Sequence, residues 1–516
     1  MKPSRSALGF FALCLMLYTL TAGGHLYSPD EEVIFRTTQA LFEHGGLSVE
    51  PIADGFGTRP GRGGHEYGQY GVGQPLLALP FYALGRALAP SLSESTWRRL
   101  YGLESEGGGA FFDATADEIA PRMACSFFNV VVGAGVATIL FLLLIELTGR
   151  GGASLAAAGV YAFGTLAWPH TRPFYNQQLS LLFMLLAWWG LARGRRGGAV
   201  GFAALAGVSV AVAAMVRLQS VLLLPGLIVL ALGPFRRGMP SREASRRAAA
   251  AFAGPILLGG VAIALLNWRQ FGGPFASGYA DQPEGIRFDA PLLAGLYGLL
   301  LSAGKGLFYF SPPLALSFAG WRPLGRAGRS LAAGVGVSVV VPLLVMAKWQ
   351  NWPGGWSWGP RHLFPIHAFL AVPIAFWIAE AWTPARRLTL VALFAAGLGV
   401  QLLGCSQDFI VFHRLFFRDP AGGFRIPYDP YDEVFWRQHV LLSARHPRTG
   451  QWTPMPLSAV PAPIHLSIYD PRMSVWKGYP LMWREFGLVD NLWLRLLREG
   501  RPSSPPEPSS QDHGAP

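Results

Sequence analysis

Residues 119–147 read IAPRMACSFFNVVVGAGVATILFLLLIEL, a stretch in which only Arg122 and Glu146 are charged. A helix that crosses a bilayer needs about 20 mostly apolar residues, and this run is long enough. Similar runs recur along the 516-residue chain, in which 51% of the residues are hydrophobic and only 14% are charged. Soluble domains carry about a quarter charged residues, so the composition predicts an all-α polytopic membrane protein. It argues against an ordinary soluble enzyme and against a disordered chain.

Eleven apolar segments are candidate membrane spans. They lie near 7–22, 119–147, 154–169, 174–192, 199–216, 218–234, 248–267, 306–320, 331–347, 363–382 and 388–404. The segment 291–303 is ambiguous, because it could be a half-helix at the membrane interface, so the count is eleven to thirteen. The first run could also be a cleaved signal peptide, but the many later spans favour an uncleaved helix.

The basic residues predict the orientation, because Lys and Arg in short loops favour the cytoplasmic side. With a cytoplasmic N-terminus, sixteen basic residues fall on that side: Lys2, Arg5, Arg150, Arg193, Arg195, Arg196, Arg236, Arg237, Arg242, Arg246, Arg247, Arg322, Arg326, Arg329, Arg386 and Arg387. The segment 23–118 would lie outside and carries thirteen acids against six arginines. The net charge of +12 is therefore a topology signal and predicts no nucleic-acid partner. A bacterial inner membrane is the simplest setting.

The chain divides by composition into three parts. Residues 1–404 form a multi-pass domain with the outer loop 23–118, residues 405–500 form an extracytoplasmic region, and 501–516 are composed like a disordered tail. No repeat with a period of 20–50 residues is present, which disfavours a secondary transporter. This layout favours a membrane enzyme that acts on the outer side.

The outer loop opens with YSPDEEVIFRTTQALFEHGG, residues 27–46. Ser28 and Pro29 followed by three acids predict the start of a helix, and capping alone is a sufficient explanation for them. The functional interpretation is that Asp30 emerges at the membrane surface. There it could take a proton from an incoming hydroxyl or amine, with Glu31 as the alternative base.

The order of basic start, span and outer loop opening with Asp-Glu resembles the membrane glycosyltransferases of the C superfamily. These include the protein O-mannosyltransferases and the lipid A aminoarabinose transferases. HEYGQYGVGQPLLALPFYALGRAL at 65–88 is similar to the family's tyrosine- and proline-containing loop and interfacial helix. The usual Lys-Pro-Pro is replaced here by Gly73-Gln74-Pro75.

Further blocks extend the resemblance over about residues 7–404. Ala120-Pro121-Arg122 opens the second span as an Arg does in those enzymes. TRPFYNQQLSLLF at 171–183 carries Gln177 and Gln178 where many relatives have a Glu. SAGKGLFYFSPPL at 302–314 and NWPGGWSWGPRHLFPIHAFL at 351–370 match blocks of bacterial members.

The resemblance implies a chemistry: inverting transfer of a sugar from a polyprenyl-phosphate donor to a glycan, lipid or protein acceptor. It implies Asp30 as the base, and Tyr70 and Gln74 as substrate-binding residues. No cofactor is expected, and a divalent metal ion is left open. The other expected partner is the lipid bilayer.

The leaving lipid phosphate is an anion and needs cations near the outer membrane boundary. Arg122, Arg217, Lys305 and Arg361 are candidates, because each is predicted at the outer end of an apolar segment. Arg217 could instead snorkel at a turn, and Lys305 could be an ordinary loop lysine. Trp356 belongs to a Trp- and Gly-rich run that could anchor at the interface or bind a sugar or isoprenoid chain.

Two other functions compete with a transferase: a transporter or flippase of lipid-linked sugars, and a non-catalytic envelope-assembly protein. His362 and His367 are interpreted as packing residues. The cysteines Cys14, Cys125 and Cys405 have neither disulfide nor metal-site spacing.

Overall fold

The computed structural model describes most of the chain up to residue 409. The described residues are 3–52, 56–102, 115–235, 241–279, 286–355, 357–380, 382–409, 417–418, 442–445, 452–455, 475–476, 479–480, 483 and 489–497. The predicted tail over 501–516 and most of the predicted outer region 405–500 lie outside these residues.

Six helices in the described ranges are long and apolar enough to cross a membrane, by length and composition. They are Ala116–Thr148, Ala199–Val216, Arg242–Phe271, Arg329–Lys348, Arg361–Glu380 and Pro384–Gly404. Shorter apolar helices cover Arg5–Leu20, Leu218–Gly233 and Leu292–Leu301. The predicted total of eleven to thirteen spans stays a prediction.

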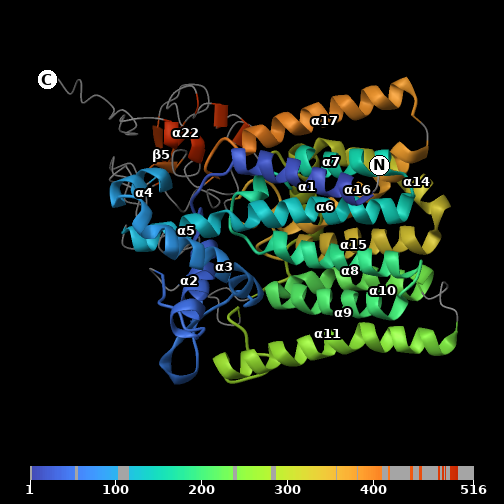
Figure 1. Cartoon of the computed structure of the whole chain (residues 1–516). Helices are drawn as coiled ribbons and strands as arrows, with labels where there is room; N and C mark the ends of the chain where they lie inside the picture. The colour runs from blue at the N-terminus through green and yellow to red at the C-terminus, as the bar shows by residue number, and fades with distance from the viewer. Residues whose placement is uncertain are drawn as a thin grey trace.

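These helices run alongside one another in a bundle (Figure 1). In chain order it contains α1 (Pro3–Leu20), α5 (Ala116–Ser126), α6 (Phe128–Thr148), α7 (Gly151–Gly164), η4 (Pro169–Thr171), α8 (Gln177–Gly194), α9 (Ala199–Val216), η5 (Leu218–Leu223), α10 (Leu224–Leu230), η6 (Ala231–Phe235), α11 (Arg242–Phe271), α12 (Leu292–Leu301), α13 (Leu307–Phe310), η7 (Pro312–Leu316), α14 (Ser317–Ala327), α15 (Arg329–Lys348), η8 (Arg361–Leu363), α16 (Phe364–Glu380) and α17 (Pro384–Gly404). Most of α16 is buried, so this helix lies in the core of the bundle.

Helix α11 presents its apolar side chains outward. Leu257, Leu258, Val261 and Leu265 are between 55% and 71% exposed. Exposed apolar surface of this kind is costly in water but suits the hydrocarbon interior of a bilayer. The exposed stripe therefore supports the membrane-protein interpretation of the sequence.

The apolar segment predicted over 306–320 is not one continuous helix. It is divided into α13, η7 and α14, with Ser311 in a non-helical conformation between the first two. Pro312 and Pro313 follow, and proline lacks the backbone N–H that a helix interior requires. The ambiguous segment 291–303 forms the ten-residue helix α12, which is about 15 Å long and too short to span about 30 Å of hydrocarbon.

The outer loop predicted over 23–118 gathers at one end of the bundle, which we call the loop end. It contains α2 (Pro29–His44), β1 (Thr58–Pro60), η2 (Arg62–Gly64), β2 (Glu66–Gly68), α3 (Gly73–Leu88), η3 (Ala89–Ser91) and α4 (Glu94–Tyr101). Strands β1 and β2 pair antiparallel. Helix α22 (Leu492–Leu497) lies at the same end, whereas the N-terminus lies at the other (Figure 1).

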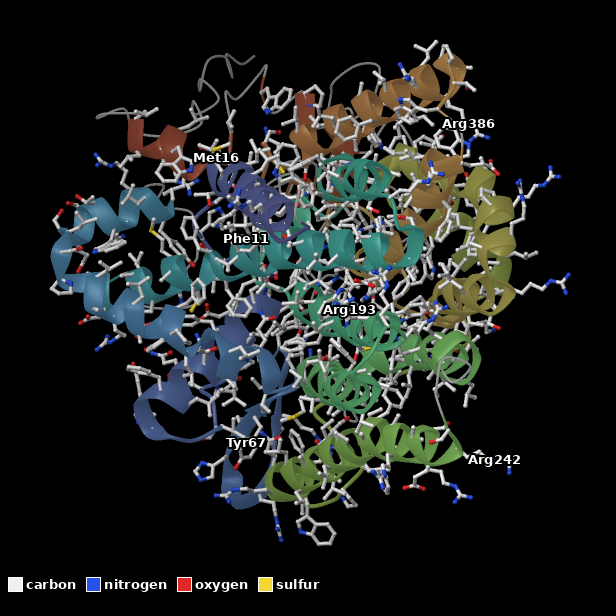
Figure 2. All side chains as sticks on the ribbon, turned by 45° about the vertical axis from the view of Figure 1, so that its right-hand side comes forward. Phe11, Met16, Tyr67, Arg193, Arg242 and Arg386 are labelled. Atoms are coloured by element: carbon white, nitrogen blue, oxygen red, sulfur yellow. The ribbon has the colours of Figure 1, made fainter. Side chains whose placement is uncertain are left out.

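A small antiparallel sheet has the order β3 (Phe417–Arg418), β4 (Leu442–Arg445) and β5 (Trp452–Met455). Two of the basic residues predicted to be cytoplasmic lie away from the loop end (Figure 2). Figure 2 shows Arg242 and Arg386 on the right, opposite Tyr67 of β2.

Candidate active site

Asp30 lies in the first turn of α2, which begins after Ser28 with Pro29 as its first residue. The helix start predicted from the sequence is therefore confirmed. The Asp30 side chain is nearly buried, yet both of its carboxylate oxygens have partners. The Tyr70 hydroxyl donates a hydrogen bond to Oδ1, and Nη1 of Arg361 donates to Oδ2 at 3.2 Å.

Arg361 opens η8 just before the buried helix α16. Its guanidinium carbon lies 5.0 Å from the centre of the Tyr175 ring, within the range of a cation–π contact. Only 7% of Arg361 is exposed. The side chain is thus held between an aromatic face on one element and the carboxylate of Asp30 on another.

Arg217 lies where α9 ends, and its extended backbone breaks the apolar run between 199 and 234. It donates to Gln219 Oε1 at 2.7 Å, to Asn176 Oδ1 at 3.3 Å and to His362 Nδ1 at 3.3 Å. Burial lowers the pKa of Arg217 to about 10, Tyr279 opposes this shift and Arg361 adds to it. We call Asp30, Tyr70, Arg217 and Arg361 the Asp30 cluster.

Gly71, just before α3, and Gly73, its first residue, allow the chain to bring Tyr70 to this position. A Cβ at Gly71 would lie 2.2 Å from the carbonyl oxygen of Met215, and one at Gly73 would lie 2.6 Å from the Val216 side chain. No other residue type allows so close an approach to the end of α9. The loop that carries Tyr70 therefore lies against the helix end that carries Arg217.

Arg122 pairs with acidic residues other than Asp30. Its guanidinium makes two hydrogen bonds to Glu32, at 2.6 and 3.0 Å, and pairs with Glu118. It also lies 4.3 Å from the centre of the Phe35 ring. Burial opposes ionisation of Glu32, but Arg122 and then Arg36 hold the pKa of Glu32 below its ordinary value. Arg122, one of the four candidate cations for the lipid phosphate, therefore pairs with Glu32 and Glu118, and its role in phosphate binding stays a prediction.

Lys305 lies near the cluster and organises a loop beside it. Its buried Nζ donates to the carbonyls of Gly355, Ser357 and Gly359 at 2.7–3.3 Å. Burial, and to a smaller extent Arg361, lower the pKa of Lys305 well below its ordinary value. These bonds shape the chain that leads into Arg361. Trp356, in the same loop, lies outside the described residues.

Glu31 and Gln74 contact the backbone of the same residue, Phe174. Glu31 accepts a hydrogen bond from the Phe174 amide at 2.7 Å, and Gln74 donates to the Phe174 carbonyl at 2.7 Å. Both side chains are fully buried. In the structure these two predicted site residues therefore bind the backbone of Phe174.

Three residues near the cluster were missed by the sequence analysis: Asn176, Tyr175 and Tyr279. Tyr279 packs edge-on against Tyr70 with ring centres 6.2 Å apart. Tyr175 and Asn176 belong to the block TRPFYNQQLSLLF, in which the sequence analysis names only Gln177 and Gln178. The polar residues directly before the apolar helix α8 could have indicated Tyr175 and Asn176.

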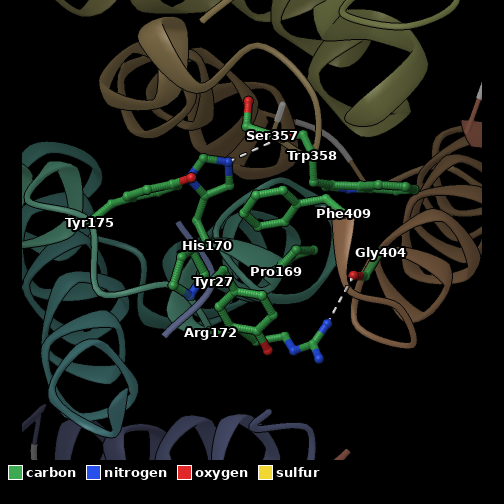
Figure 3. A pocket seen from close by; sticks show the side chains of 10 residues that line it. Tyr27, Pro169, His170, Arg172, Tyr175, Ser357, Trp358, Gly404 and Phe409 are labelled. Atoms are coloured by element: carbon green, nitrogen blue, oxygen red, sulfur yellow. Dashed lines mark hydrogen bonds between the residues drawn. The ribbon is translucent and has the colours of Figure 1, made fainter. Parts of the chain in front are cut away.

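A narrow cavity adjoins the cluster through Tyr175 (Figure 3). It is lined by Tyr27, Pro169, His170, Arg172, Pro173, Tyr175, Ser357, Trp358, Gly404 and Phe409. It encloses about 10 Å³, about the room that one water molecule needs. His170 donates to the Trp358 carbonyl at 3.2 Å through Nε2, and Arg172 donates to the Gly404 carbonyl (Figure 3).

Among the described residues, no group of three His, Cys, Asp or Glu side chains is arranged to hold a metal ion. The cations that the structure places at the cluster are the side chains of Arg217 and Arg361, and Lys305 binds the carbonyls that precede Arg361. One carboxylate faces two guanidinium groups, so the cluster has a surplus of positive charge.

Comparison with known proteins finds similar chains among the solved structures. No protein-family model matches the chain, and no curated protein matches it. The chain is similar to ArnT from Cupriavidus metallidurans, solved bound to undecaprenyl phosphate, with 12% sequence identity and a TM-score of 0.49. The match covers 85% of this chain and 68% of that chain. ArnT is a lipid A aminoarabinose transferase, one of the enzymes that the sequence blocks resemble.

Proposed function

We propose that this chain is a membrane glycosyltransferase that moves a sugar from a polyprenyl-phosphate donor to an acceptor at the loop end of the bundle. One observation carries the proposal: a nearly buried carboxylate, Asp30, lies beside Arg361 and close to Arg217 where apolar helices end. A base next to surplus cations is what sugar transfer from a lipid phosphate requires.

In the proposed reaction, the acceptor oxygen or nitrogen attacks C1 of the sugar from the face opposite the phosphate. A new bond forms at C1 as the bond between C1 and the phosphate oxygen breaks, so the configuration inverts. Asp30 takes the proton of the acceptor. The electron pair of the broken bond stays on the polyprenyl phosphate, and Arg217 and Arg361 stabilise that anion by charge-assisted hydrogen bonds.

We also propose a role for Tyr70. Its hydroxyl occupies Oδ1 of Asp30 while Arg361 occupies Oδ2. An acceptor hydroxyl must displace one of these donors to reach the base. We propose that it displaces Tyr70, because the neutral phenol is held less strongly than the ion-paired arginine.

The proposed setting is a bacterial inner membrane with a cytoplasmic N-terminus. The acidic outer loop gathers at the loop end, and the labelled Arg242 and Arg386 lie away from it (Figure 2). This separation supports the orientation inferred from the sixteen basic residues. The polyprenyl chain of the donor would lie in the bilayer, with its phosphate at the boundary near Arg217.

The test is sugar transfer in proteoliposomes. The purified full chain is supplied with undecaprenyl-phosphate sugars carrying a radiolabelled hexose or pentose, and with membrane lipids and glycans of the same cells as acceptors. Transfer of label to a non-donor product is expected. Movement of the intact donor across the bilayer without transfer would identify a flippase, and binding without either activity would identify an assembly protein.

A further inference from the structure

Glu31 neighbours the proposed base and makes bonds of a different kind. It is fully buried. Its Oε1 accepts from the Ser28 hydroxyl at 2.8 Å, and its Oε2 accepts from the amides of Tyr27 and Phe174 at 3.3 and 2.7 Å. Serine at the helix cap with glutamate three residues later is the sequence of a capping box. Here the Ser28 side chain caps no backbone N–H, and Glu31 accepts from the Tyr27 amide and from a distant amide instead.

The distant amide belongs to a short stretch of chain that several side chains hold by its backbone, residues 171–178. Gln74 donates to the Phe174 carbonyl at 2.7 Å. Asn129 donates to the carbonyls of Pro173 and Tyr175 at 2.6 and 2.7 Å. Because residues 171–178 are held from α2, α3 and α6 at once, their position depends on all four bonds.

The Asp30 cluster rests on this stretch in two places. The Tyr175 ring lies beneath the Arg361 guanidinium, and the Asn176 side chain accepts from Arg217. Both cations of the cluster thus contact residues that directly follow Phe174. The bond from Glu31 to the Phe174 amide joins them to the helix turn that carries Asp30.

We propose that Glu31 is a positioning residue, which sets the distance between Asp30 and the two arginines through its acceptor oxygens and its shape, not through its charge. This inference rests on the proposed function, and it assigns to the second acid of the Asp-Glu pair a role outside the chemistry. The described hydrogen bonds to Glu31 come from two backbone amides and one hydroxyl, and His25 acts on it only as a weaker charge without a described hydrogen bond.

Glutamine can replace Glu31 without breaking this arrangement. Its amide oxygen can accept from the two backbone N–H groups in place of Oε2, and its amide nitrogen can donate to the Ser28 hydroxyl oxygen. Leucine has a similar shape but no acceptor, so the Tyr27 and Phe174 amides lose the hydrogen bonds that Glu31 accepts from them. The pair Glu31→Gln and Glu31→Leu therefore separates acceptor geometry from charge.

The experiment measures both variants in the full chain by two readouts. The first is kcat and KM in the proteoliposome assay. The second is hydrogen–deuterium exchange of residues 171–178, which is independent of activity. Glu50→Gln, which changes an exposed carboxylate in the same outer segment, is the matched control.

We expect Glu31→Gln to keep kcat within about twofold and to keep the protection of residues 171–178. Glu31→Leu should lose that protection and about tenfold or more in kcat, because small displacements of reacting groups are costly. A Glu31→Gln chain that is protected but inactive would overturn the inference, as would a fully active and protected Glu31→Leu chain. If the wild type transfers no sugar, the proposed function fails, while the exchange data still decide whether Glu31 positions residues 171–178.

Discussion

Asp30 and Arg361 are separated by 331 positions in the sequence, yet they form a nearly buried ion pair of 3.2 Å. The carboxylate belongs to α2 at the loop end, and the guanidinium belongs to η8, directly before the buried helix α16. Removing one partner of such a pair leaves an uncompensated charge, which costs about 3–5 kcal/mol. The pair therefore joins the outer loop to the bundle at the place where we propose catalysis.

Asp30→Asn preserves the shape of the side chain and removes its charge. We expect transfer to fall by at least about 10²-fold, since the base is lost, while the protein still assembles in the membrane. The measurement is initial transfer rate per folded protein, with Glu50→Gln as the control. Near wild-type transfer by Asp30→Asn would remove Asp30 from the mechanism.

Arg217→Ala should weaken use of the donor. Its guanidinium is the member of the Asp30 cluster that pairs with no carboxylate among the contacts described above, and charge-assisted hydrogen bonds contribute about 1.5–3 kcal/mol each. We expect KM for the polyprenyl-phosphate sugar to rise about tenfold or more. Arg247→Ala, at an exposed residue in a predicted cytoplasmic loop, is the control. A loss in kcat with an unchanged donor KM would contradict a donor-binding role.

Glu31 should make stability depend on pH. Burial raises its pKa from 4.5 to about 8, so the folded chain binds more protons than the unfolded chain between these values. Its contribution to stability is therefore complete below pH 4.5 and is lost as the pH rises through about 8. Glu31→Gln does not titrate, so its melting temperature relative to wild type should increase from about pH 5 to about pH 8. Parallel melting profiles in detergent would show that Glu31 does not titrate in this range.

Asp490→Ala should detach the C-terminal segment from the loop end. The Asp490 carboxylate binds His25 at 3.0 Å, Tyr27 at 2.8 Å and Arg495 at 2.7 Å, and it pairs with Arg172. Its loss leaves the largely buried Arg172 without its carboxylate, and we expect a cost of about 3–5 kcal/mol.

The readouts for Asp490→Ala are the melting temperature and limited proteolysis after residue 409. Glu243→Ala breaks an exposed ion pair with Arg247 and should change stability by less than about 1 kcal/mol. Equal melting temperatures for the two variants would show that the Asp490 contacts add nothing to stability.

The orientation can be checked with alkaline phosphatase fusions. A fusion after residue 410 should be active, because this point is predicted to lie outside, and a fusion after residue 240 should be inactive. The reverse pattern would invert the orientation and place the Asp30 cluster on the cytoplasmic side.

Several features of the structure could be read from the sequence because they depend on neighbouring residues. The apolar run 199–216 is the helix Ala199–Val216, and α2 begins at Pro29 directly after the predicted cap Ser28. Length and hydrophobicity suffice for the first, and the Pro and acids of the first turn suffice for the second. The Pro-Pro break after Ser311 was equally readable, but the apolar composition of 306–320 obscured it.

Only the tertiary structure decided which acidic side chain pairs with which basic side chain. Asp30 and Glu32 are two residues apart. The sequence offered three arginines and one lysine as candidate cations and did not distinguish which of them pairs with which acid. The packing of α2 pairs Glu32 with Arg122 across 90 positions and Asp30 with Arg361 across 331. Ion pairs between distant residues depend on where whole helices pack, and local patterns of charge and hydrophobicity do not contain that information. The sequence by itself therefore determined helices such as Ala199–Val216 and the acidic composition of residues 23–118. The packing determined which of the acids lies among the cations.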